Sequence, residues 1–448
     1  MVLRTGQGWH DLIGAWVEAP STSCLPSLTG EPSFGNRKAL SIMTMIELEV
    51  IAGIDTHADT HHVAVIDTTG RRLGDAGFPT TLKGYKAIAA YIAAFGLVRR
   101  VGVEGTHSYG AGITQHLKDS GVRVVEVIRP NRQVRRMQGK TDQVDAYAAA
   151  SAALATDDHP EPKQLDGLVE AARYIHAARR SAVKARTATR VQIKSLLVTA
   201  PEQIRARYRS TADTALFPAL ARTRPASEEN MLTRTIVSSL KSLARRYQHL
   251  TAEIDVLEAD LEQLVLQINP GLAQTKGIGT VTAAQLLITA GGNTDRLKSE
   301  ASFAALCGTS PIPASSGKTT RHRLNRGGDR HANSALHQIA LTRMTYDQRT
   351  RDYIQRKQQE GKGTKEILRC LKRAIAREVF ALITNPIPVV DHRKLRPLRH
   401  ERGLIQLQAA AALGVSIAKI SLAENGRVHD ATFLETYETW LRKTDLTP

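Results

Sequence analysis

Hydrophobic and polar positions follow a strand-like pattern from Glu49 onward and then change to helical spacing. The segment EVIAGIDTHADTHHVAVID predicts two strands joined by a short turn, and RRLGDAGFPTT predicts a third. Helical spacing in KGYKAIAAYIAAFG and YGAGITQHLKDSG alternates with the strand segments VRRVGVEGT and VRVVEVI. Another helix opens near Asp142. Three antiparallel strands followed by alternating helices and strands predict an α/β domain in which helices flank a mixed sheet.

The rest of the chain has mostly helical spacing. The segment TIVSSLKSLARRYQHLTAEIDVLEADLEQLVLQI carries apolar residues at steps of three and four, which predicts a long helix resembling a coiled coil. Its apolar seam contains Leu250, Ile254, Leu257, Leu261, Leu264 and Ile268. We expect a multidomain chain with an N-terminal extension (1–47), an α/β domain (48–158), a basic helical and coiled-coil region (159–270), a mainly α domain (271–390) and a small all-α domain (391–448).

The first residues do not have the pattern of a folded domain. They mix Gly, Pro and Ser with isolated apolar residues and show no sustained period. A secretory signal would need a basic start followed by an apolar block, and that order is missing. We expect residues 1–47 to be disordered, and a translation start at Met43 or Met45 would leave most of them outside the native protein.

The charge of the chain points to a polyanionic partner. The 448 residues carry a formal net charge of +18, which favours nucleic acid. A membrane surface is the competing polyanion, but no uninterrupted apolar run approaches the ~20 residues of a spanning helix. The three cysteines, Cys24, Cys307 and Cys370, are widely spaced and form no zinc pattern. They fit a reducing compartment, so we expect a cytoplasmic protein without a membrane partner.

Four acids occupy positions that would bring them together. Asp55 follows the first apolar strand in IAGIDTH, and Glu104 ends another strand in VGVEGT. Asp142 and Asp145 share one face of the helix that opens in KTDQVDA. Oxygen ligands of this kind suit Mg²⁺, and two such ions ~4 Å apart can serve phosphoryl transfer. The sequence therefore predicts a magnesium site made by these four carboxylates.

Simpler interpretations of the same residues stay open. Acids in the first turn of a helix also suit the helix dipole, and any one of the four could be a cap or a surface charge. His57, His61 and His62 crowd the turn after Asp55. They are candidate ligands, although a hairpin turn often carries solvated histidines.

A second dense region begins at Cys307. Ser315, Ser316 and Gly317 lie on a loop bounded by proline and are followed by many basic residues. Arginines bind phosphate through two hydrogen bonds and offset charge on a pentacoordinate phosphorus, so Ser316 is a candidate nucleophile. A flexible turn is the simpler interpretation of Ser-Gly. The candidate nucleic-acid contacts here are Lys318, Arg321, Arg323, Arg326 and Arg330, with Lys140 beside the acids.

Two further segments are candidates for binding nucleic acid. The Gly277-Ile-Gly279 turn opens an apolar helix and resembles a helix-hairpin-helix motif, whose exposed amides bind phosphate. A plain turn between helices would have the same residues. The helical segment from Arg173 to Lys194 is rich in arginine and lysine, as expected either for a nucleic-acid surface or for a solvated helix face.

The two sites together resemble one family, the bridge-RNA-guided insertion-sequence transposases or recombinases. The resemblance rests on GIDTH, VEGT, KTDQVDA, SSGK and NRGGDRHANSALHQIAL, and it covers residues 48 to 385. It implies an RNase H-like (RuvC-like) DEDD domain, with Asp55, Glu104, Asp142 and Asp145 binding Mg²⁺, and a transposase domain with Ser316 as nucleophile. It also implies DNA as substrate, a structured guide RNA, and dimers to tetramers in which the acids of one subunit complete the serine site of another.

Two rival interpretations of the whole chain stay open. In a Holliday-junction-type nuclease, the metal site alone would cleave DNA with water and Ser316 would be structural. In a non-enzymatic repressor, the C-terminal region would be the working part. The four acids are all present, which argues against a decayed catalytic core.

The C-terminal region departs from the usual layout of that family. LIQLQAAAALGVSIAKISLAENGR resembles the helix-turn-helix of phage repressors, with Gly414 at the corner and Ser416 capping the second helix. The candidate DNA contacts are Gln406, Ser416 and Lys419. A helical module that binds protein would have a similar pattern.

Overall fold

The computed structural model describes residues 48–127, 141–157, 159–224, 230–315, 317, 322–386, 392–426, 428 and 430–443. The expected disorder of residues 1–47 therefore lies outside the described residues. The chain separates into two compact units, Met1–Pro162 and Lys163–Pro448. The remaining domain divisions drawn from the sequence stay predictions.

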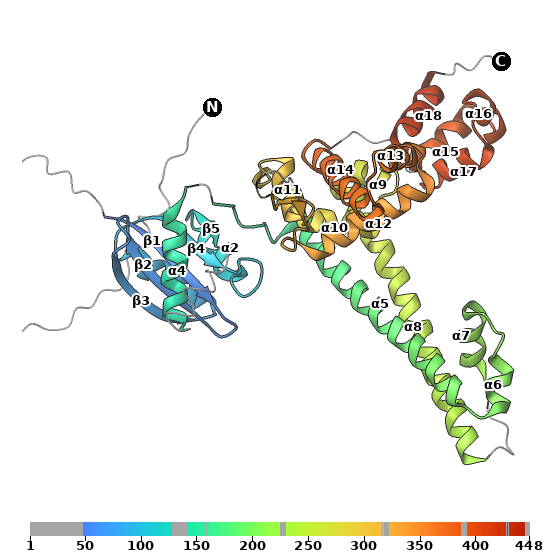
Figure 1. Ribbon diagram of the computed structural model, residues 1–448, viewed down its shortest axis with the longest axis horizontal. Helices are drawn as coiled ribbons and strands as arrows, with labels where there is room; N and C mark the ends of the chain where they lie inside the picture. The colour runs from blue at the N-terminus through green and yellow to red at the C-terminus, as the bar shows by residue number, and fades with distance from the viewer. Residues whose placement is uncertain are drawn as a thin grey trace, which may run out of the picture. The chain divides into compact units, whose positions relative to one another are not determined.

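The first unit contains a mixed five-stranded sheet with the order β3-β2-β1-β4-β5 (Figure 1). β1 pairs antiparallel with β2, and β2 with β3, while β1–β4 and β4–β5 are parallel. The bounds are β1 (Glu49–Thr56), β2 (Thr60–Asp67), β3 (Arg72–Pro79), β4 (Leu97–Glu104) and β5 (Val124–Val127). The predicted mixed sheet is confirmed, and it fits an RNase H-like domain.

Helices cover both faces of the sheet because the strands are apolar on both sides. Val50, Ala52 and Ile54 of β1 pack with α1 (Leu82–Ala93) and α2 (Ala111–Asp119). Ile51, which points to the opposite face, packs under α4 (Asp142–Ala155). Successive residues of a strand point to opposite faces, so Gly53 and Asp55 lie on the α4 side with Ile51.

Two glycines let α4 approach the sheet closely. Gly53 of β1 and Gly102 of β4 are direct neighbours in the parallel register. A Cβ at Gly53 would lie 2.1 Å from the Ala150 backbone nitrogen and 2.2 Å from the Ala146 carbonyl oxygen. The helix contributes small residues to this contact, Ala146, Ala149, Ala150 and Ala153, all of them buried. The glycines are thus required by the distance between helix and sheet.

Polar contacts fix both ends of this helix. After its last turn, the buried guanidinium of Arg100 on β4 donates to the Thr156 carbonyl oxygen at 2.7 Å and also contacts Asp157. Near its first turn, Gln143 and Tyr147 donate to Asp75 of β3 at 2.7 and 3.1 Å. The position of α4 on the sheet is therefore set by polar contacts near both ends and by the close contact with the two glycines between them.

The second unit is built around two long helices that lie side by side (Figure 1). They are α5 (Gly167–Thr199) and α8 (Met231–Ile268), and α6 (Glu202–Tyr208) and α7 (Asp213–Arg222) lie between them in sequence. The predicted long helix is confirmed as α8. Every residue of its predicted apolar seam is buried or half-buried. Coiled-coil geometry itself stays a prediction.

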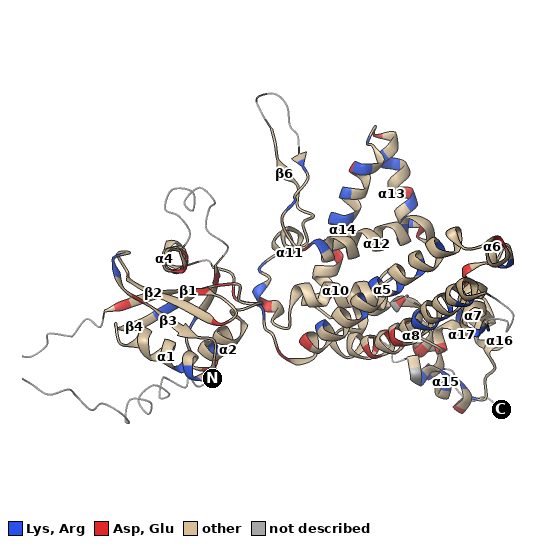
Figure 2. Cartoon of the chain, turned by 90° about the horizontal axis from the view of Figure 1, so that it is seen from below, with Lys and Arg blue, Asp and Glu red and all other residues tan. Residues whose placement is uncertain are grey.

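A compact helical region follows with its own apolar core. It contains α9 (Pro270–Gln274), α10 (Thr280–Ala290), α11 (Glu300–Leu306), the short strands β6 (Ile312–Pro313) and β7 (His322–Arg323), α12 (Arg330–Tyr346), α13 (Gln348–Gln359) and α14 (Thr364–Thr384). Lysines and arginines are numerous along α13 and α14 (Figure 2).

The C-terminal region forms four short helices around a separate core that includes Leu395, Ile420 and Tyr437. They are α15 (His392–Glu401), α16 (Gln406–Ala412), α17 (Ile417–Glu424) and α18 (Ala431–Lys443). α16 and α17 meet at 113°, and Gly414 between them has a φ of +63°. That angle and the positive φ suit the predicted helix-turn-helix, whose role in binding DNA stays a prediction.

In the described part of the chain, no single helix is both long and apolar enough to cross a membrane, although the bent α16–α17 pair reaches that length and composition together.

Substituting Gly53 should separate α4 from the sheet. We expect Gly53→Ala to lower the free energy of unfolding by roughly 1–3 kcal/mol or more, because the new methyl would overlap helix backbone that cannot rotate away. Gly77→Ala on β3 is the matched control, since its Cβ would meet nothing closer than 3.9 Å. Chemical denaturation of the two variants gives the comparison. Equal stability of the two would contradict the close-approach account.

Candidate active site

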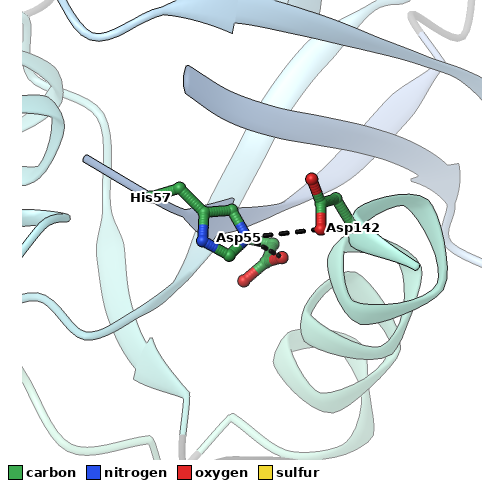
Figure 3. A group of neighbouring side chains, drawn as sticks. All are labelled: Asp55, His57 and Asp142. Carbon is green, nitrogen blue, oxygen red and sulfur yellow. Dashed lines mark hydrogen bonds and ion pairs between the residues drawn. The ribbon is translucent and has the colours of Figure 1, made fainter. Parts of the chain in front are cut away.

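Asp55 and Asp142 converge on one side of the sheet, with His57 between them (Figure 3). The His57 Nε2 atom lies 3.1 Å from Asp55 Oδ2 and 3.3 Å from Asp142 Oδ1. One ligand atom from each of the three residues lies within 4.8 Å of the others. The sequence predicted that Asp55 from β1 and Asp142 from α4 would lie close together.

The other two predicted acids come from α4 and from β4, the strand next to β1. Asp145 is one turn after Asp142 in α4, and only 2% of it is exposed. Glu104 is the last residue of β4 and is half-buried. The register that pairs Ile54 with Val103 places Glu104 beside Asp55 one step further along. All four acids thus lie where β1, β4 and the start of α4 meet.

The α4 start is ordered by local capping. Thr141 is the N-cap residue, and its hydroxyl oxygen accepts a hydrogen bond from the Val144 backbone N–H. The cap fixes the first helical turn, which carries both Asp142 and Asp145. Both acids stand in that first turn, where they would also suit the helix dipole, so the simpler interpretation stays open beside the metal site.

Burial raises the pKa of Asp55, with its neighbours contributing in both directions. The largest cause is loss of solvation, since Asp55 is only 6% exposed. The His57 ring lowers the pKa, while the negative charges of Asp145, Glu104 and Asp142 raise it. A carboxyl group that is buried among other carboxyl groups is stabilised by a cation. The donor set therefore fits a hard divalent ion, bound by carboxylate oxygens.

The three histidines after Asp55 have different surroundings. His57 faces the acids, as described above, and His62 bonds to Asp75 at 2.9 Å. His61 is buried on the other face of the sheet, where its ring stacks on Tyr85 at 5.7 Å between centroids. The signal that distinguishes them is the two-residue spacing from Asp55 to His57, which puts both side chains on one face of an extended segment.

The predicted serine loop is carried by the β6–β7 hairpin. Ile312 pairs with Arg323 and Pro313 with His322, so residues 314–321 connect the two strands. Ser316 lies outside the described residues, as do Lys318, Arg321 and Lys140. Arg323 ends β7, Arg326 follows it and Arg330 begins α12, and all three are exposed, as expected for residues that meet a polyanion.

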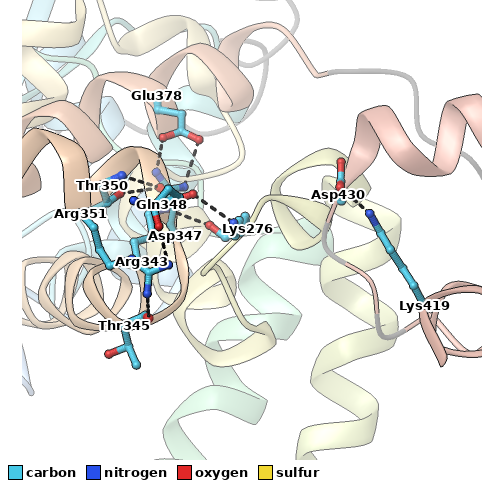
Figure 4. A network of polar contacts seen from close by, with 10 residues as sticks. All are labelled: Lys276, Arg343, Thr345, Asp347, Gln348, Thr350, Arg351, Glu378, Lys419 and Asp430. Carbon is cyan, nitrogen blue, oxygen red and sulfur yellow. Dashed lines mark hydrogen bonds and ion pairs between the residues drawn. The ribbon is translucent and has the colours of Figure 1, made fainter. Parts of the chain in front are cut away.

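The Gly277–Gly279 turn is held by a network of charged groups (Figure 4). Arg343 donates from Nε to the Lys276 carbonyl oxygen at 2.8 Å and pairs with Glu378. Lys276 in turn pairs with Asp347 at 3.0 Å. Gly277 has a φ of +81°, and a Cβ there would lie 2.8 Å from Arg343 Cγ. The turn before α10 is therefore rigid, while Gly279 at the helix start is exposed.

The three C-terminal candidates all make internal contacts. The Gln406 amide donates to Glu424, which also forms a buried ion pair with Arg399. The Ser416 hydroxyl accepts from the Lys419 backbone N–H, which confirms the predicted cap. The Lys419 ammonium lies 4.0 Å from the Phe433 ring centroid and 3.5 Å from Asp430. Their contact with DNA stays a prediction.

A row of cations on α14 was missed in the sequence. Arg369, Arg373 and Arg377 are spaced four residues apart and share a helix face with Lys372. They line a cavity of about 640 Å³ together with residues of β7 and of the segment before β6. The four-residue spacing is present in the sequence, but the cavity also needs residues of β7 and of the segment before β6, which are distant in sequence.

Two family models match this chain in separate regions. Residues 52–200 match the model of the DEDD transposase of IS110, and residues 270–355 match the model described as "Transposase IS116/IS110/IS902 family". A curated relative from Streptomyces coelicolor, the "Insertion element IS110 uncharacterized 43.6 kDa protein", is 30% identical over 153 residues. The match covers 34% of this chain and 36% of that relative, so it spans about a third of each.

The α/β unit with its converging carboxylates is thus a transposase domain of the DEDD type. The second matched region carries a model named for the same family, and the chain belongs to the IS110 family of transposases. The resemblance to insertion-sequence transposases is confirmed. Guidance by RNA and the serine nucleophile stay predictions.

Neutralising Asp55 should stabilise the protein when no divalent ion is present. Because the pKa of Asp55 is raised on folding, its stabilising contribution is present at low pH and is lost as the pH rises through the raised value. We expect Asp55→Asn in EDTA at pH 7 to have a higher Tm than wild type, and the difference to shrink toward pH 4. About 1 kcal/mol would shift Tm by roughly 4 °C at this domain size. A lower Tm for Asp55→Asn at pH 7 would show that the carboxylate is not under electrostatic strain.

Proposed function

We propose that this protein is a DNA transposase, a recombinase that cuts and rejoins DNA strands of its own insertion sequence. The observation that carries the proposal is the convergence of Asp55, Asp142 and Asp145 at one end of the sheet, in a chain that also contains the second IS110-family domain. Burial raises the pKa of Asp55, and a buried carboxyl group perturbed by neighbouring acids is typical of a functional site.

The four acids would hold Mg²⁺. When bound, the ion would neutralise charge that develops on phosphate oxygens during phosphoryl transfer. Asp55 and Asp145 are the buried members of the set and are fixed by the contact of α4 with the sheet. Asp142 is half exposed, so it lies at the open side of the group where a phosphate can approach. His57 would orient the Asp55 and Asp142 carboxylates, since its ring contacts both.

Ser316 would be the nucleophile. Its hydroxyl oxygen would attack phosphorus, the bond to the 3′ oxygen of the neighbouring nucleotide would break, and the DNA would remain joined to the protein through a 5′ phosphoserine. The serine proton must pass to a base, and the departing 3′ oxygen must gain a proton. His322 on β7 is a candidate base because it is exposed beside the loop.

The partners of the protein are proposed from its charge and from the family resemblance. The basic face of α5, the Gly277–Gly279 turn and the arginines after the serine loop would bind nucleic-acid phosphates. A structured guide RNA and a homo-oligomer from dimer to tetramer follow from the resemblance and are proposed with it. A cytoplasmic location is proposed from the widely spaced cysteines. The C-terminal helices would bind DNA as a helix-turn-helix, with α17 entering the major groove.

A metal-dependent nuclease is the second candidate function. It is favoured by one observation, which is that all four predicted acids belong to the first unit. In that case water would be the attacking group and no covalent link to the protein would form.

Neutralising Asp142 should remove activity without loss of folding. We expect Asp142→Asn to lower strand exchange in a plasmid recombination assay by roughly 10²-fold or more, as for other groups that stabilise developing charge. DNA affinity should stay close to that of wild type. Asp59→Asn is the matched control, because Asp59 is an exposed acid in the turn between β1 and β2. Full activity of Asp142→Asn would remove this residue from the site.

Ser316 should become covalently attached to DNA. Enzyme incubated with Mg²⁺ and DNA labelled on the 5′-phosphate side should retain the label after denaturation, and Ser316→Ala should not. Ser315→Ala and Ser310→Ala are the controls, because these two serines lie near Ser316 in sequence and are not the proposed nucleophile. Ser315 directly precedes Ser316, and Ser310 precedes Pro311. Retention of label by Ser316→Ala but not by Ser315→Ala would move the assignment by one residue. DNA cleavage by wild type without any attached label would favour the nuclease.

A further inference from the structure

The cavity beside α14 has an excess of positive charge. Its volume is about 640 Å³, and one acid, Glu366, lies on its wall. The cations on the wall are Arg323, Lys362, Arg369, Lys372, Arg373 and Arg377. Like charges that line a concave surface reinforce one another's field, so an anion is favoured there.

Acids neutralise this charge only in part. Glu300 is shared by Arg373 and Arg377, at 3.0 and 2.6 Å. Lys362 pairs with Glu360. Within the described part of the chain, Arg323 and Arg369 have no carboxylate within ion-pair distance. These two arginines are therefore free to bind a phosphate.

The remaining cation, Lys372, is held in place by neutral groups. Its ammonium donates to Asn333 Oδ1 at 2.7 Å, and the Asn333 amide donates to the carbonyl oxygens of Cys307 and Gly308. Burial, and then the nearby Arg369, lower the pKa of Lys372. An arriving anion would relieve the repulsion between Lys372 and Arg369.

The cavity also has an apolar part. Pro311 and Leu324 lie on its wall, and 52% of the Leu324 side chain is exposed. The volume exceeds what a lone phosphate needs and is typical of sites for small organic molecules. An occupant with one phosphate and one flat apolar group would use both parts. Residues directly before β6 and within β7 form the wall, so the occupant lies at the base of the serine loop.

We propose that this cavity, the α14 cavity, holds one nucleotide of the DNA strand next to the phosphate that the serine loop acts on. Arg323, Arg369 and Lys372 bind its phosphate, and the sugar and base lie against Pro311 and Leu324. DNA rather than RNA is the expected occupant, because the loop that joins β6 and β7 contains the proposed nucleophile, whose proposed substrate is DNA. The proposal rests on the proposed function and names a substrate contact for it.

Cys370 makes the cavity testable, because it lines the wall and its thiol is exposed. Cys307 is fully buried, and burial raises its pKa to about 12, so it will not react. In a full-length Cys24→Ser background, Cys370 is then the single reactive thiol. Its rate of modification by a soluble disulfide reagent is measured alone and with a 20-nucleotide single-stranded DNA that saturates binding by fluorescence anisotropy.

We expect the DNA to slow modification of Cys370 at least tenfold in the parent protein. Arg369→Gln should reduce this protection to less than threefold at DNA saturation. Arg349→Gln, which removes an exposed arginine of α13 outside the cavity, should keep it. Unchanged modification of Cys370 under saturating DNA would overturn the proposal. So would equal loss of protection in both variants, or protection by RNA of the same sequence without protection by DNA.

The outcome separates this inference from the proposed function. Protection of Cys370 measures whether DNA occupies the cavity, whereas strand exchange measures whether the reaction takes place. Strand exchange with an unprotected Cys370 would refute the cavity assignment alone. Protection without strand exchange or cleavage would refute the proposed reaction and leave the nucleotide site standing.

Discussion

The close approach of α4 to the sheet is the constraint on which the candidate site depends. Gly53 and Gly102 lie side by side beneath the helix, and the helix meets them with alanines. Any larger side chain at either glycine would lift the helix off the strands. Since α4 carries Asp142 and Asp145 and the strands carry Asp55 and Glu104, the distance between these layers sets the distance between the acids. Arg100 and Asp75 then fix the helix along its axis.

The same geometry has an electrostatic cost. It gathers carboxyl groups where water is partly excluded, and burial raises the pKa of Asp55. Apolar packing of Ile51, Ala146 and Ala150 around the helix offsets that cost. The His57 ring contacts two of the acids. A cation that bound this group would stabilise the folded first unit, which would link metal binding to folding.

Local patterns allowed much of this arrangement to be predicted. The alternation in the first strands and the helix that opens at Asp142 each depend on neighbours in sequence, and both were predicted from it, whereas the Thr141 cap was not. The corner at Gly414 and the Ser416 cap in the C-terminal region were predicted in the same way. Tertiary contacts were not predictable. The Asp75 contacts with α4 join residues 68 and 72 positions apart, and the internal bond of Gln406 depends on Glu424 across a turn. The cation row of α14 needed the β6–β7 hairpin beside it to define a cavity.

The central claim is that α4 and the sheet together assemble a divalent metal site. Electron paramagnetic resonance of free Mn²⁺ measures this directly, because the ion loses its sharp solution signal when it is bound. Titration of the full-length protein should show saturable Mn²⁺ binding that Mg²⁺ displaces, and Asp145→Asn should abolish it while Asp59→Asn leaves it intact. Binding by Asp145→Asn that matches wild type in affinity and number of sites would contradict the account.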